Sequence, residues 1–193
     1  MEQTDRKVSL ARLYYPVKVL GPGNRVGIWL NGCNRGCSGC VSPELQKYDS
    51  SKEVSVDEIM KMIDKIQSPI DGFTISGGEP FYKPDSLAIL VQALASITDD
   101  ILIFTGYTYE ELRARKDESI DAVLDTCSVL VDGPYIKVLN NNVGLRGSTN
   151  QRFWIFKHKD KYHGIDKEDR LFQNIVYGSN VLMIGIPLGE LDK

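Results

Sequence analysis

The sequence has no apolar segment that approaches the roughly 20 residues needed to cross a bilayer; its longest apolar run covers about residues 181–188. Its N-terminus lacks the apolar core of a signal peptide, so we expect a cytoplasmic protein with no membrane partner. Basic residues are not in excess, with 23 Lys and Arg against 26 Asp and Glu, which argues against nucleic acid as a ligand. A net charge of −3 and 42% hydrophobic residues exclude a disordered chain. The length suits a single domain over residues 1–193.

Cysteine is scarce as well, yet three of the four cysteines stand close together. Cys33, Cys37 and Cys40 form a C-x-x-x-C-x-x-C pattern, whereas Cys127 is distant in sequence. Because cytoplasmic proteins rarely keep disulfides, clustered thiols there bind metal or carry out redox chemistry. A closed zinc site or a ferredoxin cluster needs four protein ligands, and the other soft ligands are Cys127 and two distant histidines. Three local thiolates therefore suggest a four-iron cluster with one open iron, while a zinc or purely structural site remains open.

Short apolar runs alternate with amphipathic helical segments along most of the chain. Capping boxes that begin at Ser55 and Thr108, and a proline at Pro84, mark the starts of three predicted helices. This alternation is typical of a parallel sheet with right-handed crossovers. Because a complete eight-unit barrel needs about 250 residues, we predict an α/β fold, a partial, open (β/α) barrel with about five or six parallel strands. The predicted strands are residues 26–30, 72–76, 101–104, 128–131, 153–156 and 181–186.

Three loops follow successive predicted strands: the cysteine loop, residues 77–80 and residues 105–107. Since ligands bind at the carboxyl ends of parallel strands, we expect these loops to share one site. Gly77 and Gly78 allow the backbone to approach a ligand closely. Taken alone, Gly-Gly-Glu-Pro at residues 77–80 is also an ordinary strand-to-helix turn.

The cysteine spacing followed, one helix later, by Gly-Gly-Glu-Pro resembles the radical S-adenosylmethionine (radical SAM) superfamily. The resemblance implies a barrel of the radical SAM type and a [4Fe-4S] cluster held by Cys33, Cys37 and Cys40, with S-adenosylmethionine (AdoMet) at the open iron. Backbone carbonyls of residues 77–80, or the carboxylate of Glu79, would accept hydrogen bonds from the AdoMet ammonium group. Gly39 departs from the superfamily pattern, which often has an aromatic residue there, so adenine stacking must come from elsewhere. The loop residues concerned are Gly77, Gly78, Glu79 and Pro80.

Further segments resemble one branch of the superfamily, the anaerobic (class III) ribonucleotide reductase activating proteins. The resemblance covers roughly residues 14–152, and residues 153–193 form a C-terminal extension beyond the short activators. It implies that the protein removes a hydrogen atom from a backbone glycine of a large glycyl radical enzyme subunit, with an electron donor such as flavodoxin or ferredoxin. Within the extension, residues 181–187 could add a strand beside the adenine. The matching segments are residues 14–16, 21–23, 105–112, 129–136 and 145–152.

Other classes of function remain open. A radical SAM enzyme that acts on a small molecule, similar to carboxy-deazaguanine synthase, or on another peptide or protein would share the first two motifs. Such an enzyme is not expected to share residues 105–112 and 145–152. A non-catalytic iron–sulfur or zinc module for electron transfer or binding is a more distant alternative. Because 193 residues leave little chain for enclosing a substrate, we expect the target to be another protein.

Single residues near the strand ends are further candidates for AdoMet binding. Thr105, Gly106 and Tyr107 are predicted to bond the ribose or methionyl part; alternatively, they form a turn in which Tyr107 packs on its neighbour. Asp132 is predicted to bind AdoMet or to orient the target loop, with a turn role as the alternative. Arg146 is a candidate clamp for the AdoMet carboxylate or the partner's tail, because Arg binds carboxylates in a bidentate way; otherwise it is a solvated arginine.

Asn34 and Arg35 lie between two predicted ligands, where their donors could contact the cluster and tune its potential. Cys127 stands in an apolar segment and is predicted to be a packed core thiol. His158 and His163 lie in a charged segment and are predicted to be on the surface.

Overall fold

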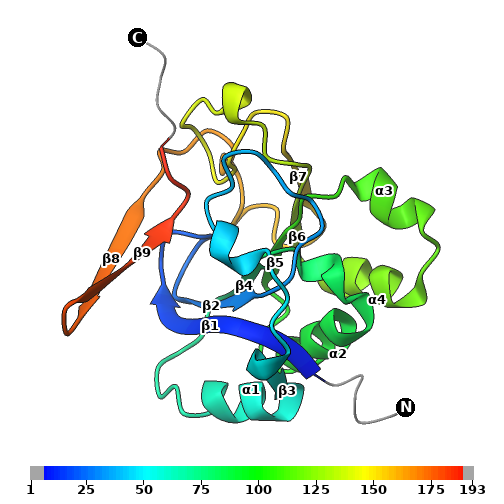
Figure 1. The fold of residues 1–193 in the computed structure, drawn as a ribbon, viewed down its shortest axis with the longest axis vertical. Coiled ribbons are helices and arrows are strands. Elements are labelled where there is room, and N and C mark those ends of the chain that lie inside the picture. The colour runs from blue at the N-terminus through cyan, green and yellow to red at the C-terminus, as the bar shows by residue number, and fades with distance from the viewer. Residues whose placement is uncertain (1–6, 189–193) are drawn as a thin grey trace.

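A seven-stranded sheet forms the centre of the molecule, whose structure, a computed structural model, describes residues 7–188 (Figure 1). The strand order is β3-β1-β2-β4-β5-β6-β7, in which β2, β4, β5 and β6 are mutually parallel. The class is therefore α/β with a sheet rich in parallel strands, as predicted. The strands are β1 (Lys7–Val17), β2 (Arg25–Leu30), β3 (Glu53–Ser55), β4 (Gly72–Gly77), β5 (Ile101–Phe104), β6 (Val129–Asp132) and β7 (Arg152–Ile155).

The parallel part of this sheet has four strands, fewer than the five or six predicted. Strands β1 and β7 pair antiparallel with β2 and β6 and flank this parallel part, and the short strand β3 pairs antiparallel with the other edge of β1. A parallel connection requires a crossover of a dozen or more residues that is usually helical. The link from β1 to β2 is too short for one, and the link from β6 to β7 contains a single 3₁₀ turn, η5 (Lys137–Leu139).

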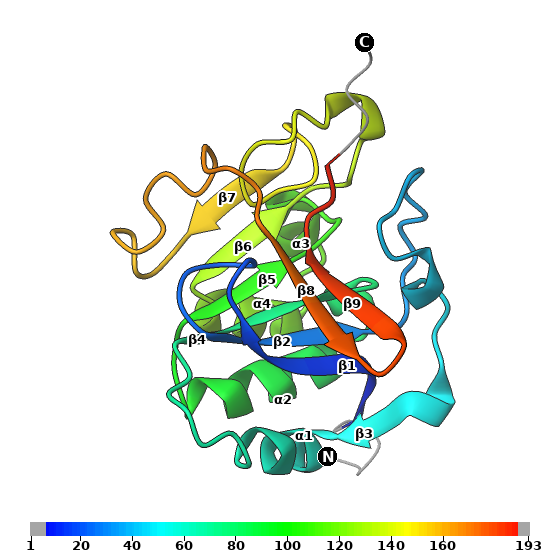
Figure 2. The ribbon, with the colours of Figure 1, turned by 90° about the vertical axis from the view of Figure 1, so that its left-hand side faces the viewer.

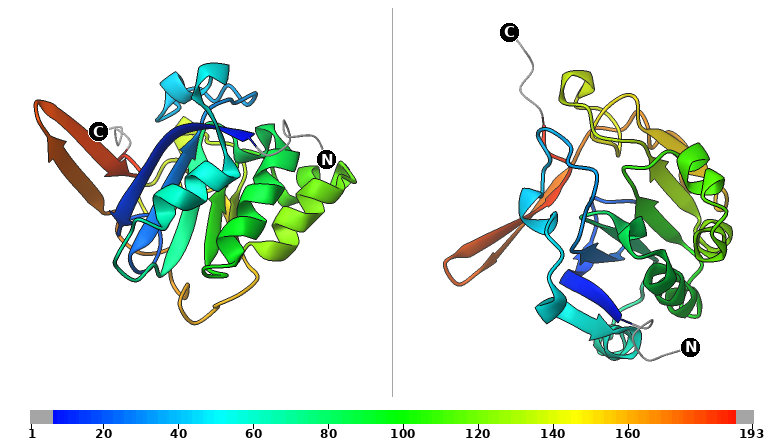
Figure 3. Two further views of the ribbon diagram at one scale, coloured as in Figure 1. Left: turned by 90° about the horizontal axis from the view of Figure 1, so that it is seen from below. Right: turned by 45° about the vertical axis from the view of Figure 1, so that its right-hand side comes forward.

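Four α-helices connect the parallel strands and lie on one side of the sheet (Figures 1 and 3). Both predicted capping boxes are present: Ser55 with Glu58, and Thr108 with Glu111. The apolar faces of the helices pack on β2, β4 and β5 to form the main core, which includes Cys127. The helices are α1 (Val56–Ile63), α2 (Pro84–Ala95), α3 (Tyr109–Ala114) and α4 (Glu118–Thr126), with 3₁₀ turns η2 (Pro43–Leu45), η3 (Ser50–Lys52) and η4 (Pro80–Tyr82).

Strands β8 (Phe172–Tyr177) and β9 (Asn180–Gly185) form a hairpin that pairs only with itself. The predicted strand at residues 181–186 thus exists, but it does not join the main sheet. The hairpin lies on the side of the sheet away from the helices (Figure 2). Leu182 and Ile184 attach it to Val17 and Leu20 through a small apolar cluster.

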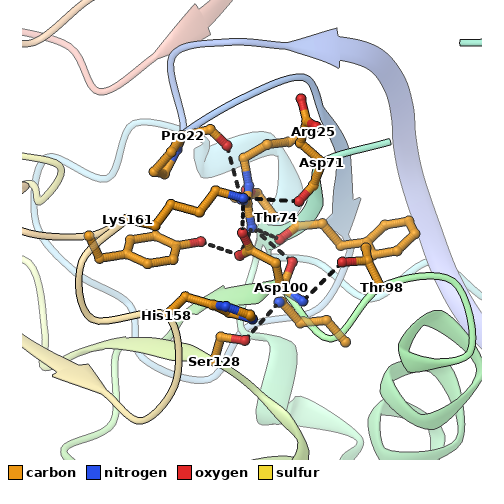
Figure 4. Close-up of polar contacts among 12 residues, drawn as sticks. Pro22, Arg25, Asp71, Thr74, Thr98, Asp100, Ser128, His158 and Lys161 are labelled. Carbon is orange, nitrogen blue, oxygen red and sulfur yellow. Dashed lines mark hydrogen bonds and ion pairs between the residues drawn. The ribbon is translucent and has the colours of Figure 1, made fainter. Parts of the chain in front are cut away.

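The amino ends of the parallel strands are closed by a buried polar network (Figure 4). Arg25, which is fully buried, donates from Nε to Thr74 Oγ1 at 2.7 Å and pairs with Asp100 Oδ1 at 3.1 Å. Lys161 and Tyr162 also donate to the Asp100 carboxylate. Burial by itself raises the pKa of Asp100, but the Arg25 charge and these hydrogen bonds hold it below its usual value.

No helix within residues 7–188 is both long enough and apolar enough to cross a membrane.

Candidate functional site

The three clustered cysteines lie on the loop that follows β2, and all three line one cavity of about 660 Å³ at the carboxyl end of the sheet. The same cavity is lined by residues from the ends of β4 and β5, and by the loop after β6. The convergence predicted from topology is therefore present. Such a volume lies within the range of small-molecule and cofactor sites, about 300–1,000 Å³.

The donor set of this cavity fits a cluster with three protein ligands. Cys33, Cys37 and Cys40 are free and partly buried thiols. No group of three or more His, Cys, Asp or Glu side chains among residues 7–188 is gathered closely enough to hold a metal ion in this structure, but the three thiols share one cavity wall. Burial raises the pKa of Cys33, while the backbone N–H of Arg35, 3.4 Å from Cys33 Sγ, opposes the shift.

A fourth soft ligand does not reach the cavity in the described part of the chain. Cys127 is fully buried in the core, and burial raises its pKa to about 12, as expected for an inert packed thiol. His158 is on the surface, where its Nε2 lies 2.9 Å from Asp99 Oδ1, and His163 is exposed. A zinc site with four protein ligands therefore does not fit these residues.

Gly77 and Gly78 allow β4 to end directly against the cysteine loop. Gly77 has φ of +111°, and a Cβ atom on it would lie 2.3 Å from the carbonyl oxygen of Leu30. A Cβ atom on Gly78 would lie 2.3 Å from the carbonyl oxygen of Gly32. The N–H of Gly78 donates to Leu30 O and that of Glu79 to Gly32 O, both at 2.8 Å. The two loops are thus joined backbone to backbone, with no room for side chains between them.

The Glu79 carboxylate connects the loops after β4 and β5. It accepts hydrogen bonds from Thr105 Oγ1 at 2.7 Å, from the Gly106 N–H at 2.8 Å and from the Phe81 N–H at 3.0 Å. Burial raises the pKa of Glu79, against the effect of these bonds. Since its oxygens already accept three hydrogen bonds from the chain, its clearest role in this structure is to shape the loops. Pro80 is buried at the start of η4 and does not line the cavity.

The candidates after β5 divide into two kinds. Thr105 and Gly106 line the cavity, although the Thr105 hydroxyl is already bonded to Glu79. Tyr107 is buried, does not line the cavity, and donates from its hydroxyl to Asn34 Oδ1 at 2.7 Å. The packing alternative therefore describes Tyr107 better than direct contact with AdoMet does.

Asp132 and Arg146 are not brought to the cavity wall. Asp132 is fully buried and accepts hydrogen bonds from the Tyr109 N–H at 2.6 Å, Trp154 Nε1 at 3.0 Å and Arg152 Nε at 3.0 Å. Arg146 donates from Nη1 to the Gln151 carbonyl at 3.0 Å. Both residues thus hold β7 and the loop before it. The hydrogen-bond partners of Asp132 are 20 or more residues away, and the Arg146–Gln151 contact follows no helical or strand period. The sequence therefore contained no local pattern that could predict these contacts.

Several cavity residues were not found from the sequence. Arg12 and Lys137 bring exposed positive charges to the wall, and Trp29 and Tyr135 bring aromatic rings. Tyr135 fills the space beside Gly39, because a Cβ atom there would lie 3.5 Å from Tyr135 Cε1. Residues 182–188, from β9 and the segment after it, complete the wall. Of these residues, Tyr135 lies in a segment, residues 129–136, that the sequence had already indicated. The others come together only in the tertiary structure.

The family model described as "4Fe-4S single cluster domain" matches residues 19–154, and together with the activating-enzyme relatives it shows that the chain is an iron–sulfur protein of the radical SAM class. The chain belongs to the family of anaerobic ribonucleoside-triphosphate reductase-activating proteins: it is 32% identical over 148 residues to that protein of Salmonella typhimurium, covering 72% of this chain and 93% of the relative. The hairpin lies beyond the last residue matched by the family model.

Two further comparisons are with proteins of a phage and a bacterium. The anaerobic ribonucleoside-triphosphate reductase-activating protein of Enterobacteria phage T4 is 29% identical over 157 residues, which is 76% of this chain and 97% of the relative. The pyruvate formate-lyase-activating enzyme of Clostridium pasteurianum is 32% identical over 105 residues, or 50% of this chain and 44% of the relative. Among solved structures, QueE from Escherichia coli superposes with a TM-score of 0.48 at 18% identity, over 55% of this chain and 56% of that one.

Proposed function

We propose that this protein is a radical SAM activating enzyme that removes a hydrogen atom from a backbone glycine of a large glycyl radical enzyme subunit, the anaerobic ribonucleoside-triphosphate reductase. The observation that carries the proposal is the cavity in which three free thiols and the close-packed Gly77–Gly78 backbone meet. The identity of 32% to an activating protein, over 93% of that protein, supports the choice of reaction.

Cys33, Cys37 and Cys40 would hold a [4Fe-4S] cluster, and three protein ligands leave one iron for AdoMet. When bound, the cluster supplies one electron that splits AdoMet into methionine and the 5′-deoxyadenosyl radical, which takes the glycine hydrogen. The chain itself supplies the ligands, the cavity and the positive charges of Arg12 and Arg35 in its wall. Such charges favour the AdoMet carboxylate and the reduced state of the site.

AdoMet would contact the backbone of Gly77, Gly78 and Gly106 directly, because these residues line the cavity and have no side chain. Glu79 and Thr105 would keep this backbone in place through their mutual hydrogen bond. Asp132 and Arg146 would act indirectly, by holding the loop between β6 and β7 that carries Tyr135 and Gln151 into the wall.

Tyr135 is the residue we assign to the adenine ring. It lies in the cavity wall beside Gly39, and a Cβ atom on Gly147 would come within 2.8 Å of Tyr135 Cδ2. The glycine at position 147 therefore leaves space for the Tyr135 ring, which meets Gly39 at an ordinary van der Waals distance. Stacking of a base on an aromatic side chain contributes about 1–3 kcal/mol.

The cavity mouth is suited to a polypeptide segment of the partner. Val41, Met183 and Leu188 line the cavity and are also 63%, 58% and 58% exposed. Because these apolar side chains both line the cavity and are exposed, we expect a glycine loop of a large subunit to contact them as it enters. We therefore assign residues 153–188 to the same domain as residues 7–152, with the hairpin contacting the partner's glycine loop as well as completing the wall; residues 189–193 of the predicted extension lie outside the described residues.

The electron donor would approach the outer side of the cysteine loop. Asn34, Gly36 and Ser38 are exposed there, in the loop that carries the three thiols, and do not line the cavity. A small flavodoxin or ferredoxin could then reach the cluster without passing through the cavity. Salt-dependent reduction rates with purified flavodoxin and ferredoxin would test this assignment; equal reduction by a bulky donor unable to contact the loop would contradict it.

The proposed function is tested by anaerobic reconstitution of the wild type, Cys37→Ala and the matched control Cys127→Ala. We expect about four iron and four sulfide per chain in the wild type and in Cys127→Ala. With AdoMet and dithionite these proteins should release methionine and 5′-deoxyadenosine, whereas Cys37→Ala should not, because it lacks a proposed cluster ligand. Full cleavage by Cys37→Ala, or binding of zinc without sulfide, would contradict the site.

Hydrogen abstraction needs a separate measurement. The reconstituted protein is mixed with AdoMet, a reductant and a purified large subunit of anaerobic ribonucleoside-triphosphate reductase. Electron paramagnetic resonance should then show a glycine-centred doublet that disappears when the subunit's glycine is replaced by alanine. AdoMet cleavage without any such doublet, but with turnover of a small molecule, would favour a radical enzyme of the small-molecule class.

A further inference from the structure

The Tyr107 side chain joins the cysteine loop to the loop after β5. Its hydroxyl donates to Asn34 Oδ1 at 2.7 Å, and its ring centroid lies 4.5 Å from Cζ of Arg35. Both of these partners stand between Cys33 and Cys37 in the sequence. Since Tyr107 is only 5% exposed and does not line the cavity, its contacts are with the loop and not with a ligand.

Two residues of α3 and its C-terminal end support this contact. Cζ of Arg115 lies 3.9 Å from the Tyr107 ring centroid, so the ring carries two guanidinium groups. The Glu111 carboxylate lies 3.8 Å from Nη2 of Arg35 and also belongs to the capping box of α3. Arg35 is therefore held by an aromatic face and by an opposite charge.

Residues 34–36 depend on these contacts for their position. Within residues 7–188, the hydrogen bonds, ion pairs and ring contacts that lead from residues 34–36 out of the cysteine loop go to Tyr107 and Glu111. The backbone N–H of Arg35 bonds within the loop, to Cys33 Sγ, and a Cβ atom on Gly36 would meet nothing within 4 Å. Without Tyr107 this segment would lose most of its attachment to the body of the protein.

We propose that Tyr107 is a positioning residue for the iron–sulfur site: it fixes residues 34–36 and thereby keeps the Arg35 side chain in the wall of the cavity that the three thiols line. Arg35 lines the same cavity as the three thiols, and the lack of a side chain on Gly106 makes room for it, since a Cβ atom there would lie 3.0 Å from Arg35 Cγ. A fixed positive charge beside a cluster stabilises its reduced, more negative form. The inference rests on the proposed function only in taking the three cysteines as cluster ligands.

The first test measures hydrogen–deuterium exchange in the cysteine loop of the purified, reconstituted protein. Tyr107→Phe removes one hydrogen bond and should speed exchange of residues 33–40 about fivefold, and Tyr107→Leu should speed it further. Tyr109→Phe is the matched control, because the Tyr109 ring stacks on Trp154, away from the loop. Unchanged exchange of residues 33–40 in both Tyr107 variants would overturn the proposal.

The second test measures the midpoint potential of the cluster by a redox titration. Arg35→Gln and Tyr107→Leu should each shift the potential to a more negative value, and the double variant should shift it no further than Arg35→Gln alone. Additive shifts, or no shift in Tyr107→Leu, would overturn the proposal. If Tyr107→Leu fails to fold, Tyr107→Phe and Arg115→Gln are titrated in its place, with a smaller shift expected in the same direction.

The two proposals fail in different ways. If the wild type assembles no [4Fe-4S] cluster, the proposed function is wrong. If the cluster assembles and cleaves AdoMet, but exchange and potential do not respond to Tyr107, only the role assigned to Tyr107 is wrong.

Discussion

The two ends of the parallel strands differ in that one is filled by paired polar side chains and the other surrounds an open cavity. At the amino end, the long side chains of Arg25 and Tyr162 fill the interior, and Asp100 satisfies them and Lys161 (Figure 4). At the carboxyl end, the strand-end glycines and the partly buried thiols line an open cavity, together with longer side chains such as Trp29 and Tyr135. At the amino end the polar groups are thus paired with one another, whereas at the carboxyl end backbone groups and thiols line the cavity and are available to a ligand. The comparison shows how one short sheet separates stability from chemistry.

The largest effect is expected from Asp100→Ala at the amino end. The substitution leaves the fully buried Arg25 guanidinium without its carboxylate, which costs about 3–5 kcal/mol of unfolding free energy. Urea unfolding followed by circular dichroism measures the loss. Iron bound per folded molecule should stay at the wild-type value, because the network is remote from the cysteines; a parallel loss of iron from folded protein would mean that the two ends are coupled.

Strand β4 allows a direct comparison, because glycines occur at both of its ends. Gly78→Ala places a Cβ atom 2.3 Å from Gly32 O and should reduce AdoMet cleavage roughly a hundredfold by moving the cysteine loop. Gly72→Ala places a Cβ atom 2.4 Å from Arg25 Nη1, so it should lower stability and leave cleavage by the folded protein unchanged. The measurements are the AdoMet cleavage rate and the urea unfolding midpoint of both variants. An equal loss of cleavage in the two would show that the two ends of β4 do not have separate roles in chemistry and stability.

A smaller effect, on binding alone, is expected at Tyr135. Tyr135→Ala should weaken AdoMet binding about tenfold, which corresponds to ~1.4 kcal/mol of lost stacking, while Tyr135→Phe should bind nearly as the wild type does. Isothermal titration of the reconstituted protein with AdoMet measures both. If the alanine variant binds with wild-type affinity, adenine does not lie on this ring.

The smallest effect is a difference in how stability depends on pH. Asp100 has a lowered pKa in the folded protein, so its contribution is complete above the unfolded value of about 4 and is lost as the pH falls through the folded pKa. Glu79 has a raised pKa, so the folded state retains its proton longer, and stability falls as the pH rises from the unfolded value of about 4 toward the folded pKa.

The pH dependence is measured by urea unfolding at a series of pH values for the wild type, Asp100→Asn and Glu79→Gln. Asp100→Asn should remove a component that increases with pH, and Glu79→Gln a component that decreases with pH. If both substitutions changed the pH dependence of the unfolding free energy in the same direction, the pKa values of Asp100 and Glu79 would not be shifted in opposite directions.

Much of the fold follows from local signals in the sequence. The capping boxes at Ser55 and Thr108 mark helix starts because each satisfies backbone N–H groups within four residues. The four parallel strands are recognisable as apolar runs since they are buried, and their carboxyl ends bring the cysteine loop and residues 77–80 together. These features depend only on short segments and on the handedness of crossovers.

The remaining features depend on contacts between distant residues. Strand β9 is recognisable as a strand from its apolar residues, but those residues do not indicate that it pairs with β8 and not with the main sheet. The burial of Arg25 becomes tolerable only because Asp100, 75 residues away, is buried with it. Likewise, Asp132 was predicted at the site because it ends a strand, yet Arg152 and Trp154 from β7 take up its oxygens. Such pairings have no local pattern.

The separate hairpin gives the cavity one wall that is held less firmly than the others. It is fixed to β1 and the residues after it by Leu182, Ile184 and the Gln173 side chain, which donates to Pro16 O at 2.8 Å and accepts from the Lys18 N–H at 3.1 Å. It shares no backbone ladder with the sheet. We therefore expect local opening of β8 and β9 to cost less free energy than unfolding of the sheet, so that this wall of the cavity can move while the cysteine loop keeps its shape.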